Sequence, residues 1–355
     1  MKRFVAFLTI AQTKSAKKEA KAARSSGVLE AILKSSKLKS YTFNDLSVAT
    51  RNFHPDSVIG EGAFGRVYKG WVDGNTFAAA KWGTGLVITI KRYNNEVPEA
   101  DNAWLFKTLS ANSLPPPNIV INSVGKLCHP NIVKLIGYCK DKKHRLLVYE
   151  YMPQGSLDTH LFRKDSEFQP LSWKLRISIA LGAARALAYL HSPETNVIHR
   201  DVKTANLLID SKYNAKLSGF ECARAGPIDE TFVTTLVKGT FGYLDPEYFY
   251  SGQVRMKSDV YSFGVVLLEI LTGRKAIDMN LPEVDRVLFS WVESRLSKEH
   301  VISDIMDADI EGQYTEGAAE EAFSLAFKCT SRDSKSRPDA KQVVEELEQL
   351  LASVN

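Results

Sequence analysis

The most informative segment of this chain reads Ile198-His-Arg-Asp-Val-Lys-Thr-Ala-Asn-Leu-Leu208. Its spacing puts a proton acceptor, a cation and an amide oxygen on one loop. In phosphoryl transfer such a loop uses an aspartate to accept the proton of the substrate hydroxyl, and an asparagine to bind Mg²⁺. We therefore expect Asp201 and Lys203 to be catalytic residues, Asn206 to be a ligand of Mg²⁺ and ATP, and Leu208 to contact ATP.

A glycine-rich segment, Gly60-Glu-Gly-Ala-Phe-Gly-Arg-Val67, lies upstream of that loop. Its GxGxxG spacing also occurs in dinucleotide-binding folds, but those require a helix directly after the third glycine. Here Val67-Tyr-Lys-Gly-Trp71 continues as a strand, which favours a hairpin that covers the phosphates of ATP. The predicted ATP contacts in this hairpin are Ile59, Gly60, Glu61, Gly62, Gly65 and Val67.

Lys91 ends the next apolar segment, Val87-Ile-Thr-Ile-Lys91. A lysine at such a position is commonly a solvated strand end. Downstream of the glycine-rich segment it becomes the candidate that pairs with the α- and β-phosphates of ATP. We therefore include Lys91 among the predicted ATP contacts.

The order of the predicted elements separates strands from helices. Alternating β-branched residues predict strands within 57–92 and at 132–138 and 145–151, whereas helical periods dominate from Trp173 onward. Strands followed by helices indicate an α+β fold in which a sheet-rich lobe precedes a helical lobe. Three segments are expected, namely a basic tail at 1–40, a sheet-rich lobe and hinge at 41–152, and a helical lobe at 153–350.

Several motifs follow the predicted catalytic loop in the order that a helical lobe of this kind requires. Gly239-Thr240 and Asp245-Pro-Glu247 resemble the end of an activation segment, and Asp259 begins a long apolar helix. We expect Arg337, in Arg-Pro-Asp339, to pair with Glu247 across the lobe. The simpler alternative is that Glu247 and Arg337 are two unrelated surface charges.

Together these motifs resemble the plant receptor-like cytoplasmic kinases, the group that includes the avirulence-responsive, PBS-like serine/threonine protein kinases. Characteristic segments are Tyr41–Phe53, 71–85 and His144–Met152. The resemblance implies a bilobal protein-kinase fold that uses ATP and Mg²⁺, with a receptor kinase or other signalling protein as partner. It also implies a cytoplasmic location, a gatekeeper at Tyr149 and an adenine-binding hinge that includes Glu150 and Met152.

The sequence departs from this family at the metal-binding Asp-Phe-Gly motif. The corresponding segment reads Gly219-Phe220-Glu221, so the chelating aspartate is replaced by Gly219. Phe220 is retained and can pack as a core aromatic residue. Because Mg²⁺ requires hard oxygen ligands, Asn206 alone is a weak site, and the alternative is that Glu221 substitutes for the missing acid.

A second departure concerns the helix that should carry a glutamate partner for Lys91. Alignment from Trp104 forward puts Lys107 at that position, and alignment back from His129 puts Val120 there. The two registers imply an insertion at 106–120, which contains three consecutive prolines that interrupt a helix. Glu96 and Glu99 are alternative partners, and a mis-spliced transcript would also explain the segment.

The composition is that of an ordinary globular protein, with 355 residues, 44% hydrophobic and 25% charged. Residues 1–40 contain ten basic and two acidic residues, a net charge of +8, which leaves −3 for residues 41–355 because the whole chain carries +5. The sequence after the tail has no basic patch with interleaved aromatic residues, so nucleic-acid binding is not expected. Lys2 stands where related kinases carry an acylated glycine, so we expect only weak peripheral membrane contact through the basic tail, at the cytoplasmic face of the plasma membrane.

Two functional hypotheses remain. The first is a catalytically impaired pseudokinase that serves as a scaffold or decoy in plant receptor or immune signalling. The second is an active serine/threonine kinase that transfers the ATP γ-phosphate to protein hydroxyls. Under either hypothesis the activation segment offers phosphorylation candidates with Arg200 as a phosphate-binding residue, namely Thr231, Thr234, Thr235 and Thr240.

Overall fold

The computed structural model describes residues 38–62, 64–94, 127–140, 143–163, 169–227, 231–296 and 302–353. The predicted tail up to residue 37, the segment 106–120, and Glu96 and Glu99 lie outside these residues. The described residues form two compact units, which are treated separately. The first contains 38–94, 127–128, 134–140 and 143–151, apart from residue 63, and the second contains the rest. Within the described part of the chain, no helix combines the length and the hydropathy needed to cross a membrane.

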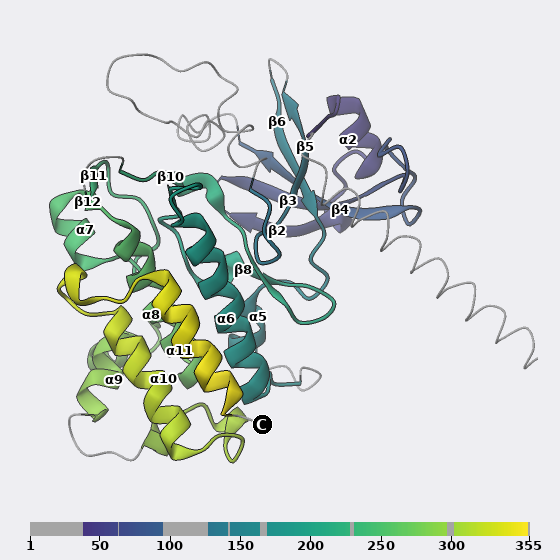
Figure 1. Ribbon diagram of the computed structural model, residues 1–355. Helices are drawn as coiled ribbons and strands as arrows, with labels where there is room; N and C mark the ends of the chain where they lie inside the picture. The colour runs from purple at the N-terminus through teal and green to yellow at the C-terminus, as the bar shows by residue number, and fades with distance from the viewer. Residues whose placement is uncertain are drawn as a thin grey trace, which may run out of the picture. The chain divides into compact units, whose positions relative to one another are not determined.

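The first unit is built on a six-stranded sheet with the order β1-β5-β6-β4-β3-β2 (Figure 1). Adjacent strands are antiparallel except β1 and β5, which are parallel. The predicted strands are present, but residues 73–85 form turns between two of them rather than continuing the strand. The strands are β1 (Lys39–Ser40), β2 (Val58–Gly62), β3 (Gly65–Val72), β4 (Leu86–Tyr93), β5 (Leu135–Lys140) and β6 (Arg145–Glu150).

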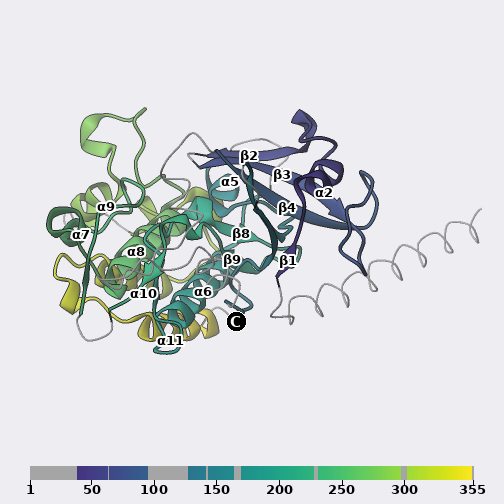
Figure 2. The same cartoon turned by 90° about the horizontal axis from the view of Figure 1, so that it is seen from above.

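The core of the first unit lies between this sheet and helix α2 (Phe43–Ala49), which lies close to the sheet in Figure 2. Alternation in β4 buries Ile88 and Ile90 completely on the face that α2 covers. Thr42 and Asp45 form a reciprocal capping box that fixes the start of α2, and Leu46 is fully buried beneath it. The segment before the glycine-rich hairpin is therefore part of the sheet's hydrophobic core.

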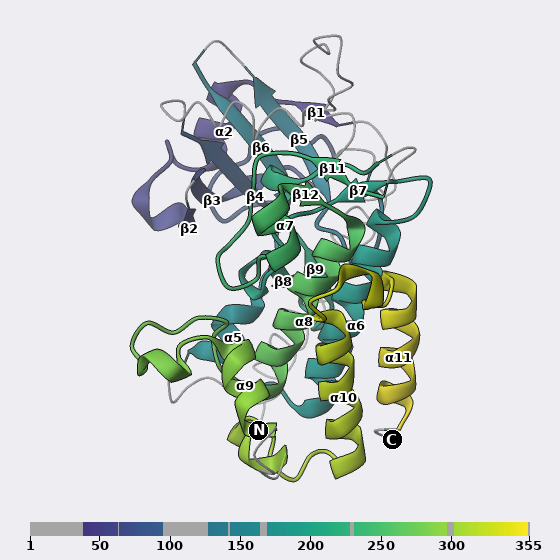
Figure 3. The same ribbon diagram turned by 90° about the vertical axis from the view of Figure 1, so that its left-hand side faces the viewer.

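The second unit is mainly helical, and α6, α8, α10 and α11 pack together in it (Figure 3). Its short β-strands form two-stranded pairs, β7 with β10, β8 with β9 and β11 with β12. The helices are α5 (Leu157–Phe162), α6 (Trp173–Leu190), α7 (Pro246–Ser251), α8 (Met256–Thr272), α9 (Leu288–Leu296), α10 (Glu316–Cys329) and α11 (Ala340–Ala352). The short strands are β7 (Val197–Ile198), β8 (Leu207–Ile209), β9 (Ala215–Leu217), β10 (Arg224–Ala225), β11 (Val233–Thr234) and β12 (Gln253–Val254).

Helix α8 is the central helix of the second unit. Every residue from Ser258 to Thr272 is buried, because apolar residues surround the helix instead of forming a single stripe. Helix α11 is amphipathic by contrast and buries Val343, Leu347 and Leu350. A sheet-rich unit followed by a helical unit confirms the predicted α+β fold.

Candidate active site

The glycine-rich hairpin of the first unit has the predicted strand–loop–strand form. β2 pairs with β3 so that Gly60 lies opposite Val67, and Gly62 lies opposite Gly65. Gly65 has φ +138°, and a Cβ there would overlap the carbonyl oxygen of Arg92, so only glycine fits. Ile59 is half-exposed on β2. Because its glycines have no Cβ, a phosphate group can approach the backbone of this hairpin closely, as a phosphate-covering loop requires.

Lys91 lies on β4 beside this hairpin, opposite Val67 on β3 and Leu147 on β6. Its ammonium group is 6.0 Å from the centre of the Phe64 ring and 5.6 Å from that of Tyr93. The first unit thus brings the predicted lysine and the glycine-rich hairpin together.

The two predicted hinge residues have different surroundings. The Glu150 carboxylate in the first unit is buried and accepts a hydrogen bond from the Lys134 backbone N–H at 2.8 Å. Met152 belongs to the second unit, where its side chain is buried and its carbonyl accepts from Gly155 N–H. The Glu150 side chain therefore has a structural contact to the preceding strand region, in addition to any role of its backbone.

Asp259 fixes the backbone of the predicted catalytic loop within the second unit. Its buried carboxylate accepts hydrogen bonds from the backbone N–H of His199 at 2.8 Å and of Arg200 at 2.7 Å, and it lies 2.9 Å from the His191 ring. Arg200 has φ +66°, which is unfavourable for a residue with a Cβ. The two hydrogen bonds to Asp259 stabilise that turn and set the direction of the residues that follow.

The loop residues Asp201, Lys203 and Asn206 converge as predicted, and Thr240 joins them. Thr240 Oγ1 donates to Asp201 Oδ1 at 2.6 Å and accepts from Lys203 Nζ at 2.7 Å. Lys203 Nζ also lies 3.0 Å from Asp201 Oδ2. The structure thus places Thr240 in this cluster, and its proximity to a carboxylate argues against the predicted phosphorylation of Thr240.

Asn206 and Gly219 are in close contact, at the position where the kinase resemblance implies a metal-binding aspartate. Gly219 adopts a left-handed conformation, with φ 81° and ψ 46°. A Cβ built on Gly219 would lie 2.5 Å from Asn206 Cγ, so the asparagine amide fills the space of the absent side chain. In that orientation Asn206 Nδ2 donates to the Asp201 carbonyl at 2.7 Å and to Asp201 Oδ2 at 3.1 Å.

These residues do not fit the pair of Mg²⁺ ions that phosphoryl transfer uses. Asn206 offers one neutral oxygen, and the Asp201 carboxylate already binds Thr240, Lys203 and Asn206. Across the described ranges, no group of three or more His, Cys, Asp or Glu side chains could hold a metal ion. Glu221 lies in the 3₁₀ turn Phe220–Cys222, and Phe220 packs edge-on against His199.

The activation segment brings one of the predicted threonines to Arg200. Arg200 Nη1 lies 3.5 Å from Thr235 Oγ1 and 3.4 Å from the Tyr248 hydroxyl. Arg224 is buried, and its Nε has no hydrogen-bond partner among the residues that the structure describes; burial and the charge of Arg200 lower the pKa of Arg224. Thr234 is exposed, whereas Thr231 accepts from Arg255 Nη1 at 2.8 Å.

The sequence of the chain is similar to those of known protein kinases. The family model described as protein tyrosine and serine/threonine kinase matches residues 53–347. Receptor-like cytoplasmic kinase 176 of Oryza sativa subsp. japonica is 49% identical over 320 residues, which cover 90% of this chain and 78% of that protein. The serine/threonine-protein kinase BIK1 of Arabidopsis thaliana is 48% identical over 344 residues, covering 97% and 83%. The chain belongs to the plant receptor-like cytoplasmic kinases.

The predicted pairing of Glu247 with Arg337 is wrong for this receptor-like cytoplasmic kinase. Arg337 Nη1 and Nη2 each lie 2.8 Å from the Asp245 carboxylate, and both side chains are buried. Glu247 is more exposed; it lies 3.2 Å from Arg255 Nε and accepts from the Ser334 N–H. Hydrogen bonding to the Ser334 side chain, followed by the charge of Arg255, lowers the pKa of Glu247. Asp245 takes the inner position because it is the N-cap of α7, whereas Glu247 lies in the first turn.

A buried network in this kinase involves residues that the sequence did not single out. The Glu269 carboxylate is fully buried and accepts from the Tyr243 hydroxyl at 2.8 Å, from Thr204 Oγ1 at 3.0 Å and from the Ala276 N–H at 2.8 Å. Burial raises the pKa of Glu269 to about 8 despite these hydrogen bonds. The network links the catalytic loop, the activation segment and α8, and no sequence spacing reveals it.

Proposed function

We propose that this receptor-like cytoplasmic kinase is a pseudokinase with impaired phosphotransfer, which serves as a phosphorylation-responsive scaffold or decoy in plant receptor or defence signalling. The observation that carries the proposal is the Asn206 amide in the space of a side chain at Gly219. Phosphoryl transfer depends on charge neutralisation and positioning, so the loss of a metal-binding carboxylate affects its main source of catalysis. Loss of one such group typically lowers the rate roughly a hundred- to a thousand-fold.

The hydrogen bonds of Asn206 extend this argument. Its Nδ2 donates to the carbonyl and the carboxylate of Asp201, so Asn206 can offer a cation only its Oδ1, a single neutral ligand. The glycine-rich hairpin, with Lys91 beside it on β4, supplies the groups that would contact a nucleotide.

The proposed scaffold role rests on Thr235 and its neighbours. A phosphate on Thr235 would lie beside Arg200, whose charge also acts on the neighbouring Arg224, and Arg224 Nε has no hydrogen-bond partner among the described residues. Phosphate groups form strong charge-assisted hydrogen bonds with arginine, so a partner receptor kinase that modifies Thr235 would order this segment. By analogy with the named relatives, we place the protein in the cytoplasm, with its basic tail as a weak contact to the plasma membrane.

One observation favours a second candidate function, an active serine/threonine kinase. Asp201, Lys203 and Thr240 form the compact hydrogen-bonded cluster that accepts a hydroxyl proton in phosphoryl transfer. Under this alternative, Glu221 or another acid replaces the missing metal ligand.

A transfer assay separates the two functions. The full chain is incubated with ATP and a generic basic protein substrate, first with Mg²⁺ and then with Mn²⁺, beside an Asp201→Asn variant. We expect both proteins to give the same background signal. Transfer by the unmodified chain at a rate at least about tenfold above the Asp201→Asn variant would overturn the proposal.

A further inference from the structure

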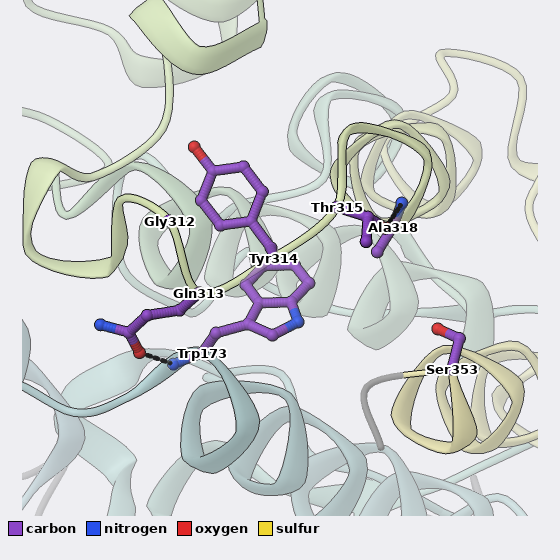
Figure 4. Close-up of a pocket in the computed structure, with 7 residues that line it drawn as sticks. All are labelled: Trp173, Gly312, Gln313, Tyr314, Thr315, Ala318 and Ser353. Carbon is purple, nitrogen blue, oxygen red and sulfur yellow. Dashed lines mark hydrogen bonds between the residues drawn. The ribbon is translucent and has the colours of Figure 1, made fainter.

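The second unit contains a cavity of about 300 Å³ among the start of α6, the loop before α10 and the end of α11 (Figure 4). Its walls include Trp173 from α6, Tyr314 and Thr315 from the loop, Ala318 from α10 and Ser353 after α11. Gly312 and Gln313 complete the lining, and every residue that lines the cavity is uncharged. None of these residues belongs to the candidate active site.

Trp173 contributes an unsatisfied hydrogen-bond donor to this cavity. Its side chain is only 1% exposed, and no partner for its indole Nε1 is present in the described part of the chain. Its backbone N–H donates to Gln313 Oε1 at 3.0 Å, which fixes the residue at the cavity floor. Figure 4 shows the nitrogen edge of the indole directed toward the space between Ala318 and Ser353. A buried donor without an acceptor is unfavourable, so an acceptor supplied by a ligand would stabilise it.

Two hydroxyl groups of the cavity form hydrogen bonds within the protein, and neither is a partner of Trp173 Nε1. Thr315 Oγ1 accepts from the Ala318 N–H at 3.2 Å as the N-cap of α10, so its hydroxyl proton remains to be donated. Ser353 Oγ donates to the Leu350 carbonyl at 2.8 Å. Tyr314 supplies a ring 5.4 Å from that of Trp173 and inclined to it by 48°. The cavity therefore combines an aromatic wall with a donor that requires an acceptor.

We propose that this cavity is a binding site for a small, neutral, planar molecule that carries a carbonyl oxygen, such as an aromatic amide. The carbonyl accepts from Trp173 Nε1–H, and the ring packs against Tyr314. Binding of an anion is disfavoured, because no cationic side chain lines the cavity to offset the cost of desolvating the anion. The volume is at the lower end of ligand pockets, roughly 300–1,000 Å³, which suits a ligand with a single ring.

The test uses benzamide as the probe and the indole N–H signals of the full chain as the readout. The chain contains five tryptophans, so labelling with ¹⁵N-tryptophan gives five indole signals. A Trp173→Phe variant assigns the relevant one; if that variant does not fold, the four other Trp→Phe variants assign it by elimination. We expect benzamide to shift the Trp173 signal in a saturable way, and toluene, which has no acceptor, to leave it unchanged.

Two further variants make the test specific. Ala318→Leu adds a side chain at the cavity wall and should weaken benzamide binding, followed by the Trp173 signal, at least about tenfold. Trp291→Phe is the matched control: Trp291 Nε1 also lacks a hydrogen-bond partner among the described residues, but the Trp291 ring contacts Arg274 and Arg295 and does not line this cavity. An unshifted Trp173 signal, an equal shift with toluene, or unchanged affinity in Ala318→Leu would each overturn the proposal.

Discussion

The amide of Asn206 lies where a side chain at Gly219 would begin, with only 2.5 Å between Asn206 Cγ and the position of a Cβ at residue 219. The two residues are separated along the chain but are joined by the short β8–β9 pair, whose register brings Leu207 opposite Leu217. Ser218 N–H and Oγ both donate to the Asn206 carbonyl, at 2.8 and 2.9 Å. The absence of a carboxylate at position 219 and the orientation of the Asn206 side chain are therefore linked, because the amide fills the space that a side chain at 219 would need.

Restoring the acid at position 219 should create a response to Mg²⁺ that the natural chain lacks. The Gly219→Asp side chain would displace the Asn206 amide and supply a second oxygen ligand. We expect ATP with Mg²⁺ to raise the melting temperature of Gly219→Asp by at least about 2 °C over ATP alone, and to have no such effect on the unmodified chain. Differential scanning fluorimetry measures this shift.

Gly219→Asn is the control for that experiment, because it adds nearly the same volume without charge. Like the unmodified chain, Gly219→Asn should show no rise in melting temperature when Mg²⁺ is added to ATP. A shift in the unmodified chain as large as that in Gly219→Asp would mean that another acid already binds the metal.

The buried pair of Asp245 and Arg337 should contribute much more to stability than the partly exposed pair of Glu247 and Arg255. Arg337→Met leaves a buried carboxylate without its partner and should lower the free energy of unfolding by about 3–5 kcal/mol. Glu247→Gln should cost about 1 kcal/mol or less, because solvent screens that pair. Urea denaturation measures both, and similar losses would contradict the observed pairing.

Glu269 should make stability depend on pH. Its pKa rises from an ordinary 4.5 to about 8 on folding, so between these values the folded protein holds a proton that the unfolded chain has released. The free energy of unfolding should therefore fall as pH increases across that range, and level off above about pH 8.

The difference between the unmodified chain and Glu269→Gln isolates this effect. Burial lowers the pKa of His199, so His199 destabilises the fold as pH falls, but it does so in both proteins. Denaturation from pH 5 to pH 9 should show the unmodified chain losing stability relative to Glu269→Gln. A difference that is constant with pH would contradict a raised pKa at Glu269.

Phosphorylation of Thr235 should stabilise the second unit. Arg200 lies beside its hydroxyl, and Arg224 is close enough to Arg200 for the charge of Arg200 to lower the pKa of Arg224, so one to three charge-assisted hydrogen bonds to arginine can form. Chains with phosphothreonine at position 235 should melt at a higher temperature than unmodified chains, and Arg224→Gln should reduce the gain. Phosphothreonine at the exposed Thr234 is the comparison, and an equal gain there would show that Arg200 and Arg224 are not responsible.

Local spacing explains which parts of the site could be predicted from sequence. Asp201, Lys203 and Asn206 lie within six residues of one another, so their convergence follows from one loop. The hydrogen bond between Thr240 and Asp201 joins residues 39 positions apart, and no motif reveals it. The pairing of Arg337 was wrongly predicted because Asp245 and Glu247 differ only in how α7 begins, with one as N-cap and the other in the first turn.

The α+β fold was predictable for a related reason. Alternation in β4 and the all-round apolar surface of α8 are each contained in one continuous segment. The substitution at Gly219 was also visible in the sequence. The accompanying position of Asn206 was not, because it depends on how two strands bring distant residues into contact.

The number of phosphates that the chain adds to itself tests the central claim most directly. Phosphatase-treated full chain is incubated with ATP and either Mg²⁺ or Mn²⁺, and its intact mass is measured beside that of Asp201→Asn. Impaired phosphotransfer predicts that both proteins keep the unphosphorylated mass under both conditions. Phosphate added to the unmodified chain but not to Asp201→Asn would show that the site is catalytically active and would contradict the account.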